Sequence, residues 1–383
     1  MFIVRHPTTA AGIRNAAWVF LAAVLVLPPA ARAQEARPAP WSVLRASYYD
    51  ADTKIAVRPE IAAKSLPQTA TFEVDFVGFS PDAQAAFQRA VDIWSSLVTS
   101  PVPIRIQAVW TPLGPGILGG AGAQFIHRDF TGAAQPGTWY VDALADAQAG
   151  MDLNPGFHDI VAQFNSSFGQ WYFGTDGNPG PGLFDLVTVV LHEIGHGLGF
   201  TGSFTVDQGG VGSWGLTTGI PFAYDTFAED GSGTSLLDEN AFPNNSVAVT
   251  NVLQSDDVFF NGPNLNLANN GQPAPLFAPN PFLQGSSFSH FDENAYPPGN
   301  PGSLMTPFLA QNEVIHDADD LALCLFEDLG WDTAAQCGGA APTCVPSATA
   351  ICLNDDRFRV ELEWVFPSTG EKRDAGVVPF GSD

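Results

Sequence analysis

Two histidines one helical turn apart enclose a glutamate in the segment LHEIGHGLGF, residues 191–200. On a helix, the four-residue spacing of His192 and His196 brings both imidazoles to one face, where they can bind the same metal ion. Glu193 then lies beside that ion and can act as the general base for a metal-bound water. A hydrolytic zinc site takes three protein ligands and leaves the fourth position to water. The segment therefore predicts a zinc site with one ligand still to be found.

His290 is the candidate third ligand with the best context. It follows the serine-rich turn GSSFSH and lies 15 residues before Met305 (305 − 290) in the segment SLMTP. We therefore predict that His290 completes the site.

The other histidines and the nearby acids are weaker candidates. His316 precedes an expected helix and is predicted to lie at the surface, whereas His127 and His158 are predicted to be structural. An acidic third ligand, Asp225 or Glu229, remains open as an alternative, as in a gluzincin-like peptidase.

The helix that must carry the first two histidines has a continuous apolar stripe. At 100° per residue the histidines lie opposite this stripe and the glutamate lies on its flank, so the helix is expected to present the histidines to a cleft. Gly195 and Gly197 each weaken the helix by about 1 kcal/mol, which is unusual in a purely structural helix. Gly199 suits a left-handed turn that ends it. The stripe consists of Leu183, Leu186, Val187, Val190, Leu191, Ile194 and Leu198.

These motifs resemble those of the metzincin zinc metalloproteases, and specifically the leishmanolysin-like branch. HEIGHGLGF corresponds to the metal-binding helix of that family, SHFDE to its third histidine and LMTP to its methionine turn. Where metzincins commonly have their third histidine, this chain has Gly202; His290 follows His196 by 94 positions (290 − 196). The resemblance covers roughly residues 70–332, without the rich cysteine pattern of eukaryotic members.

The resemblance implies an α+β fold with a twisted mixed sheet, an active-site helix, and a long loop-rich insertion, about residues 201–288, before the third ligand. It implies a zinc-dependent endopeptidase in which Glu193 activates a zinc-bound water to attack a polypeptide substrate. The alternative from another functional class is a noncatalytic exported adhesion or binding module in which zinc is structural. A fourth protein ligand would indicate that alternative.

Several elements are predicted before and after this helix. Residues 70–79 and 102–110 alternate as strands do, and 159–167 is another strand-like run. Between the first two strands, Ser80 as the N-cap and Pro81 at the first helical position predict a helix. A later helix is expected over 316–331 with Asp317 as its N-cap, and 357–366 reads as a lone strand.

The N-terminus reads as an export signal. Arg5 and Arg14 precede an apolar run, and ARA (31–33) is a small-residue cleavage site, so we predict cleavage after Ala33, secretion, and no stable membrane anchor. Residues 34–67 are a Pro- and Ala-rich linker or short propeptide. The catalytic domain is expected over 68–335 and is followed by a cysteine-containing tail, 336–383. A partial β domain is one interpretation of this tail.

The charge is strongly acidic, with 40 acidic and 15 basic residues, and no Lys or Arg occurs between Arg128 and Arg357. Removal of the signal peptide, with its three arginines, takes the net charge from −25 to −28 (−25 − 3). Such a chain repels phosphate backbones, which argues against nucleic acid as a partner. A carboxypeptidase needs a cation for the substrate's terminal carboxylate, so endopeptidase action is favoured. An acidic cleft would favour substrates with Lys or Arg.

The cysteines and acidic clusters suggest two further features. An exported chain with four cysteines predicts two disulfides, with three pairings open; the sequential pairing of Cys324 with Cys337 and Cys344 with Cys352 is preferred. The segments AEDGSG (228–233) and DADD (317–320) are candidate calcium sites, although neither matches an EF-hand loop.

Overall fold

The structure is a computed structural model of the 383-residue chain. It describes residues 35–51, 53–55, 69–216, 218–334, 337, 345–354, 357–365 and 372–379. The predicted signal peptide lies outside the described residues, so the structure leaves that prediction untested. Among the residues that are described, none of the helices has the length and apolarity needed to cross a membrane.

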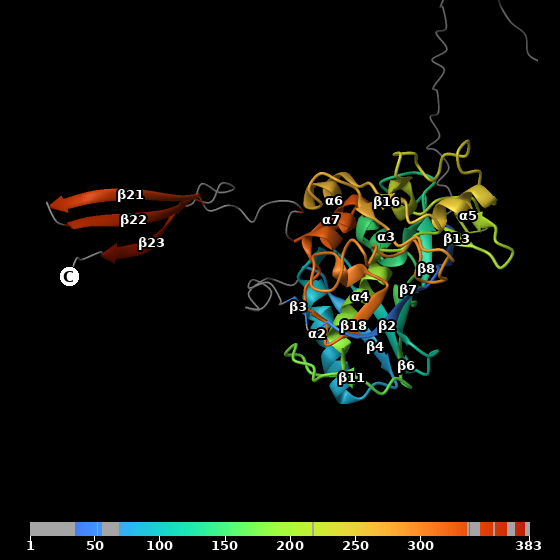
Figure 1. The fold of residues 1–383 in the computed structure, drawn as a ribbon, viewed down its shortest axis with the longest axis horizontal. Coiled ribbons are helices and arrows are strands. Elements are labelled where there is room, and N and C mark those ends of the chain that lie inside the picture. The colour runs from blue at the N-terminus through green and yellow to red at the C-terminus, as the bar shows by residue number, and fades with distance from the viewer. Residues whose placement is uncertain are drawn as a thin grey trace, which may run out of the picture. The chain divides into compact units, whose positions relative to one another are not determined.

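A twisted, mixed six-stranded sheet forms the centre of the main body, as predicted for an α+β fold (Figure 1). The strand order is β18-β2-β7-β10-β6-β4. The three strands β10, β6 and β4 are parallel, β7 is antiparallel to β10, and β2 is antiparallel to β7 and parallel to β18. In sheet order the bounds are Phe308–Gln311, Ser42–Asp50, Ile117–Ala123, Ile160–Asn165, Ile104–Thr111 and Phe72–Val77.

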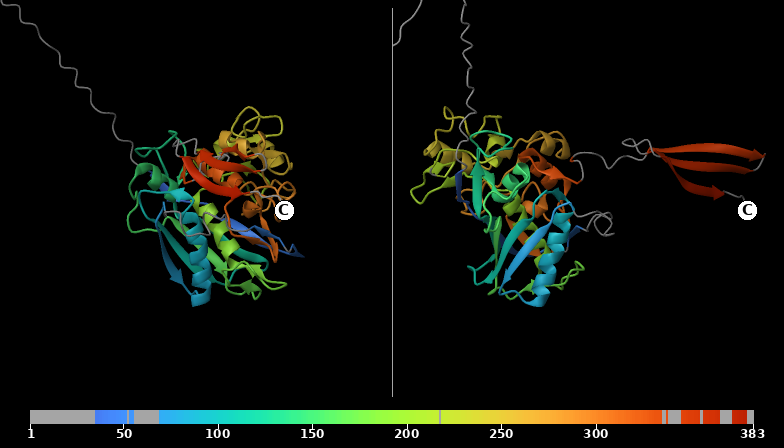
Figure 2. Two further views of the ribbon diagram at one scale, coloured as in Figure 1. Left: turned by 90° about the vertical axis from the view of Figure 1, so that its left-hand side faces the viewer. Right: turned by 180° about the vertical axis from the view of Figure 1, so that it is seen from behind.

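Two helices pack side by side on one face of this sheet (Figure 2). Helix α2 (Pro81–Ser95) begins as predicted, because the Ser80 side chain accepts a hydrogen bond from the Ala83 amide at 3.2 Å. Helix α4 (Leu186–Leu198) carries the HEIGH segment. The Trp94 indole of α2 donates to the Leu191 carbonyl of α4 at 2.9 Å, which fixes the two helices to each other inside the core.

Helix α4 differs from its prediction in two respects. It begins later, because Phe184–Asp185 forms the short strand β12 and the Asp185 carboxylate caps the helix by accepting from the Thr188 amide at 2.8 Å. Leu183 therefore lies outside the helix. All thirteen helical residues are buried, so the helix does not present its histidines to an open cleft.

The N-terminal segment, predicted as a linker or propeptide, is built into the sheets. Strand β1 (Glu35–Pro38) pairs with β8 (Phe125–Arg128), which in turn pairs with β9 (Tyr140–Val141). Strand β2 enters the central sheet, and β3 (Lys54–Ile55) pairs with β19 (Val314–Ile315). Its conformation in this chain is therefore set by tertiary hydrogen bonds.

The insertion is rich in loops and short elements. Its buried apolar side chains belong to the same core as α4, except Phe222, which packs in a separate cluster with Ile126 and Trp139. Two short helices interrupt it, which the sequence did not indicate. Its elements are β13 (Thr205–Val206), β14 (Gly212–Ser213), η1 (Tyr224–Phe227), β15 (Ala228–Asp230), α5 (Val247–Leu253), β16 (Val258–Phe260), α6 (Pro263–Ala268) and β17 (Ala274–Pro275).

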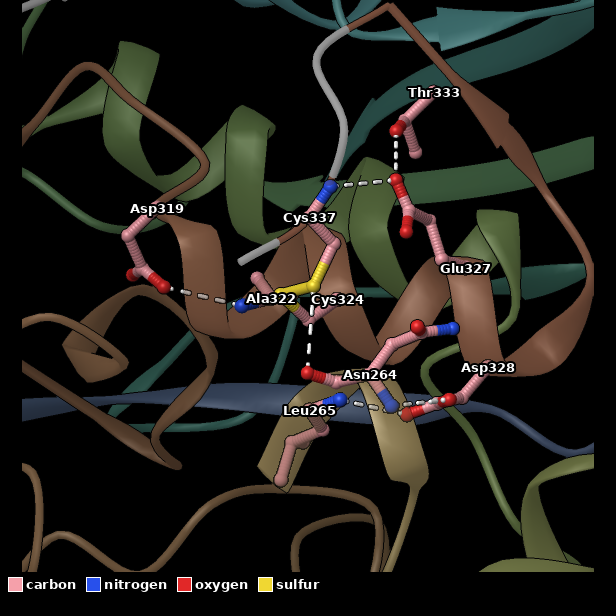
Figure 3. The surroundings of a disulfide bond; sticks show 9 residues. All are labelled: Asn264, Leu265, Asp319, Ala322, Cys324, Glu327, Asp328, Thr333 and Cys337. Atoms are coloured by element: carbon pink, nitrogen blue, oxygen red, sulfur yellow. Dashed lines mark hydrogen bonds between the residues drawn. A yellow bond between two sulfur atoms is a disulfide. The ribbon is translucent and has the colours of Figure 1, made fainter. Parts of the chain in front are cut away.

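The remaining elements of the main body include α7 (Asp320–Leu329), whose N-cap is Asp319 and not the predicted Asp317. The Asp319 side chain accepts from the Ala322 amide at 3.1 Å (Figure 3). The others are β5 (Val98–Thr99), α3 (Asp142–Ala149), β11 (Trp171–Tyr172), η2 (Ser303–Met305) and β20 (Asp332–Thr333).

A disulfide joins Cys324 of α7 to Cys337, as the sequential pairing predicted (Figure 3). The backbone amide of Cys337 donates to the Glu327 carboxylate at 2.9 Å, so the segment after α7 folds back onto that helix. The Asp328 carboxylate accepts from two amides at the start of α6, which ties the insertion to α7. Cys344 and the side chain of Cys352 lie outside the described residues.

The tail contains a three-stranded antiparallel sheet of β21 (Val345–Asn354), β22 (Arg357–Val365) and β23 (Lys372–Pro379). The strand expected over 357–366 is therefore not alone, because it pairs with a neighbour on each side.

Candidate metal centre

The three predicted histidine ligands converge on one point in the core. The Nε2 atom of His196 lies 2.9 Å from that of His192 and 3.1 Å from that of His290, and the third separation is 3.3 Å. All three side chains are buried, with at most 1 % of their surface exposed. The structure thus brings His290 back to α4 across the whole insertion, and these three residues form a group that could hold a metal ion.

Each imidazole is oriented by a backbone carbonyl. The Nδ1 atom of His192 lies 2.6 Å from the Leu304 oxygen, that of His196 lies 2.7 Å from Phe200, and that of His290 lies 2.7 Å from Ser286. Because a carbonyl oxygen only accepts, each Nδ1 must carry the proton and donate it. Each Nε2 is therefore left with a lone pair.

Three lone pairs that face one another at about 3 Å cannot hydrogen-bond among themselves, so the arrangement is suited to a cation. Zinc–nitrogen bonds of about 2.0–2.1 Å in tetrahedral geometry separate the nitrogens by about 3.3–3.4 Å, close to the separations found. Burial lowers the pKa of His192 to about 4 and the pKa values of His196 and His290 well below their usual value. The imidazoles are therefore neutral near pH 7, the form that ligates a metal. The donor set fits a metal ion.

Glu193 lies on α4 next to the first ligand and is fully buried. Neither of its carboxylate oxygens has a hydrogen-bond partner among the described residues. Burial raises the pKa of this carboxyl well above its usual value. The backbone amides of Leu44 and Ala121 face the carboxylate and partly offset this rise, although neither is placed to form a hydrogen bond with it. Strand β7 passes so close that a methyl group on Gly119 would lie 2.8 Å from Oε1.

Met305, the methionine of the predicted methionine turn, lies buried against α4. A methyl group on Gly195 would lie 2.9 Å from its sulfur, and one on Gly197 would lie 2.5 Å from the Ile160 side chain. Close packing thus accounts for both helical glycines, which the sequence analysis interpreted as unusual in a purely structural helix. The turn that carries Met305 also supplies the Leu304 carbonyl that orients His192.

The acids considered as alternative third ligands are engaged elsewhere. The buried Asp225 carboxylate accepts from the Ser203 amide at 2.8 Å and the Phe222 amide at 2.8 Å, and also from the Ser203 hydroxyl. The Glu229 carboxylate accepts from the Asn261 side-chain amide at 2.7 Å. Among the described residues, neither belongs to a group of three ligands with the histidine pair.

The other histidines have partners of their own. His316, predicted at the surface, is buried, and its Nε2 lies 2.8 Å from the Asp185 carboxylate at the start of α4. His127 is buried against Asp142 at 2.7 Å, in keeping with a structural role. His158 is partly exposed and lies 2.8 Å from Asp75. His316 was misread because its partner lies 131 positions away in sequence.

Arg45 is a residue near the centre that the sequence did not indicate. Its Nε donates to the Ser286 hydroxyl at 3.4 Å, and the carbonyl of Ser286 holds His290. Residues 129–356 contain no Lys or Arg, but strand β2 brings an arginine from the N-terminal segment to the neighbourhood of the third ligand. The segment SVLRAS does not alternate strictly between polar and apolar residues, so no clear local signal marked this strand.

A second buried group consists of three carboxylates, Asp142, Asp146 and Asp159, whose oxygens lie within 4.8 Å of one another. Burial raises the pKa of Asp146 to about 8 and that of Asp159 to about 7. In the predicted calcium segments, Asp319 caps α7 and Asp230 accepts from the amides of its own turn. Calcium binding stays a prediction.

The comparisons with known proteins are limited to one short match. A family model described as SPBPB7E8-like matches residues 138–209, which include α4 but neither His290 nor Met305. No curated protein and no solved structure matches the chain.

Proposed function

We propose that the protein is a secreted, zinc-dependent endopeptidase with a metzincin-like catalytic core. The observation that supports this most strongly is the convergence of three proton-free Nε2 atoms beside a buried glutamate that has no hydrogen-bond partner. A purely structural site has no use for an unpaired carboxylate at that position, and burying one is costly. Among the described residues the group has three ligands, which leaves a fourth position for water.

The residues divide the work of peptide hydrolysis as follows. His192, His196 and His290 hold the metal, and the carbonyls behind their Nδ1 atoms keep each ring in the ligating tautomer. A zinc ion held there would lower the pKa of its water toward about 7 and polarise the scissile carbonyl. Glu193 would accept a proton from such a water and pass it to the leaving amine.

Endopeptidase action agrees with the charge distribution. No Lys or Arg occurs from 129 to 356, so this part of the chain offers no cation for a terminal carboxylate. Arg45 lies near His290, but it belongs to the N-terminal strand β2, and its guanidinium donates to the Ser286 hydroxyl.

The test is a Glu193→Gln substitution, with zinc stoichiometry and casein cleavage measured on the same preparations. The amide keeps the size of the side chain and cannot take up a proton, so we expect one zinc per chain and a loss of at least about a hundredfold in turnover. His290→Ala serves as the comparison and is expected to lose both zinc and activity. Full peptidase activity in Glu193→Gln would contradict the mechanism. Zinc binding without peptidase activity in any form of the protein would favour the noncatalytic module.

A further inference from the structure

The metal centre is closed to any substrate in this structure. Glu193 and the three histidines have at most 1 % of their surface exposed, although hydrolysis of a polypeptide requires a chain to lie against them. A cavity of about 190 Å³ is lined by Thr201, Gly202 and Ser289 next to the third ligand and by Pro40, Trp41 and Ser42 from the N-terminal segment. The N-terminal segment thus borders the cavity beside the third ligand.

Strand β2 lies between two rims and is hydrogen-bonded to both. Toward one rim, the Val43 amide donates to the Gly285 oxygen at 2.8 Å and the Arg45 amide to the Pro307 oxygen at 3.1 Å. Toward the other rim, the Ala46 amide donates to the Gly116 oxygen at 2.8 Å, next to the ladder with β7. Alternate amides thus point to opposite sides, as in an extended peptide seated in a groove.

The same strand covers the general base. Leu44 is paired with Gly119 of β7, and its backbone amide faces the Glu193 carboxylate. Arg45, the next residue, donates to Ser286 beside the third ligand. Leu44 and Arg45 of β2 therefore lie beside groups that a reacting peptide would have to approach.

Both rims have glycines at the contacts with this segment. A methyl group on Gly120 would lie 3.1 Å from the Ser42 oxygen, and one on Gly122 only 2.5 Å from the Pro40 oxygen. On the opposite rim, a methyl group on Gly285 would lie 2.9 Å from the Val43 side chain. Side chains at these positions would push the segment away, so the groove is shaped for close approach of a backbone.

We propose that residues Ser42–Ala46 occupy the groove in which a polypeptide substrate binds, as a strand between β7 and the Gly285–Pro307 rim, and that the segment must leave before the centre can act. This inference rests on the proposed peptidase function. Recognition through main-chain hydrogen bonds on both sides suits an extended polypeptide of variable sequence, because any residue except proline can donate them. The N-terminal segment is thus a tethered occupant of the substrate groove.

The first experiment replaces Val43 by proline in the chain without its signal peptide. Proline removes the amide that donates to Gly285, whereas the matched control Val43→Ala keeps it. The loss of one hydrogen bond from a two-sided strand is expected to raise the open population about five- to tenfold. We therefore expect three rates to be five- to tenfold higher in Val43→Pro than in Val43→Ala. They are the release of zinc to a chelator, the hydrogen exchange of the β7 amides and the cleavage of casein.

The outcomes separate this inference from the proposed function. Faster zinc release and exchange without any casein cleavage would leave the occupied groove standing and count against the peptidase. Equal zinc release and equal exchange in the proline and alanine variants would overturn the inference, whatever the activity.

A second design covers the case in which the proline variant fails to fold. A recognition sequence for a specific protease replaces part of residues 56–68, the chain is cut there, and the freed N-terminal segment is separated by dilution and gel filtration. Activity is expected to rise after separation and to fall again when a peptide of residues 40–50 is added, but not with the reversed sequence. Loss of exchange protection throughout α4 after separation would show that β2 is an integral strand and overturn the inference.

Discussion

The substitution Asp146→Asn tests whether the buried carboxylate group destabilises the protein near neutral pH. Burial is the main cause that raises the pKa of Asp146 to about 8; the Leu153 amide opposes the rise, and the neighbouring Asp142 and Asp159 contribute to it. In the unfolded chain the same carboxyl titrates near about 3.9. Between these values the folded protein holds a proton that the unfolded chain releases, so the free energy of unfolding falls as the pH rises from about 4 to about 8.

The size of the effect follows from the pH interval. One proton contributes about 1.4 kcal/mol per pH unit, so the rise from pH 5 to pH 7 costs up to about 3 kcal/mol. Relaxation around the cluster reduces this, and we expect Asp146→Asn to be more stable than the parent by about 1–3 kcal/mol at pH 7. At pH 4 the two should agree. The asparagine oxygen can still accept from the Leu153 amide, which lies 3.0 Å from Oδ1.

Urea unfolding at pH 4, 5, 6, 7 and 8 in the presence of a chelator measures this difference. The exposed Asp256 is a suitable control, because its left-handed backbone, with φ of 52°, tolerates asparagine and its carboxylate faces solvent. A parent protein that becomes more stable between pH 5 and pH 8 would refute the reasoning, as would an Asp146→Asn variant less stable than the parent at pH 8. Stabilisation of the parent alone by added calcium at pH 8 would show that the carboxylates bind that ion.

Two further predictions concern the catalytic groove. Gly119→Ala places a methyl group 2.8 Å from the Glu193 carboxylate, so turnover should fall at least about tenfold while the zinc content stays unchanged. The control Gly114→Ala adds a methyl group that makes only ordinary contacts and should keep its activity. Equal turnover in the two variants would show that the position of the glutamate is not critical. The cavity beside the third ligand has no charged side chain among its described residues, and its lining mixes apolar side chains such as Leu216 and Phe282 with hydroxyl side chains. A peptide library cleaved by the opened protein should therefore show uncharged side chains near the scissile bond, and enrichment of Lys or Arg there would instead support an acidic groove.

The parts of the fold that the sequence predicted are those with strong local signals. Helix α2 starts at Ser80 because a serine side chain and a following proline suit an N-terminus whatever packs on the helix. Strands β4, β6 and β10 alternate or run apolar over six to eight residues, and each lies within two residues of its predicted bounds. The histidine group could be predicted because the chain has few histidines and only one of the remaining candidates had the expected neighbours.

Several strands were not predicted, among them β7, which lines the proposed groove, and β2, which occupies it. Strand β7 reads ILGGAGA, and glycine has a low strand propensity, so its sequence gives no local signal for a strand. Pairing with β10 and β2 makes it a strand. Its glycines are required because Glu193 and the N-terminal segment approach more closely than side chains at Gly119 and Gly122 would permit. Strand β2 lies in a Pro- and Ala-rich stretch whose partners are up to about 240 positions away, as in the bond from Ser286 to the Val43 carbonyl. Such pairings are set by tertiary contacts.

The deferred third ligand also has a physical explanation in the structure. A methyl group on Gly202, which stands where a histidine was first expected, would lie 2.1 Å from the Phe288 ring, so the place is filled by the returning chain. The Gly202 amide donates to the Ser289 hydroxyl at 3.1 Å, immediately before His290. Tyr224 of the insertion fixes the same turn by donating to the Phe288 carbonyl at 3.1 Å. The end of α4 and the end of the insertion therefore hold each other, and the geometry of the third ligand depends on the insertion's own packing. A spacing of 94 positions (290 − 196) is compatible with a tight site because the closure is made by a few short contacts at the two ends.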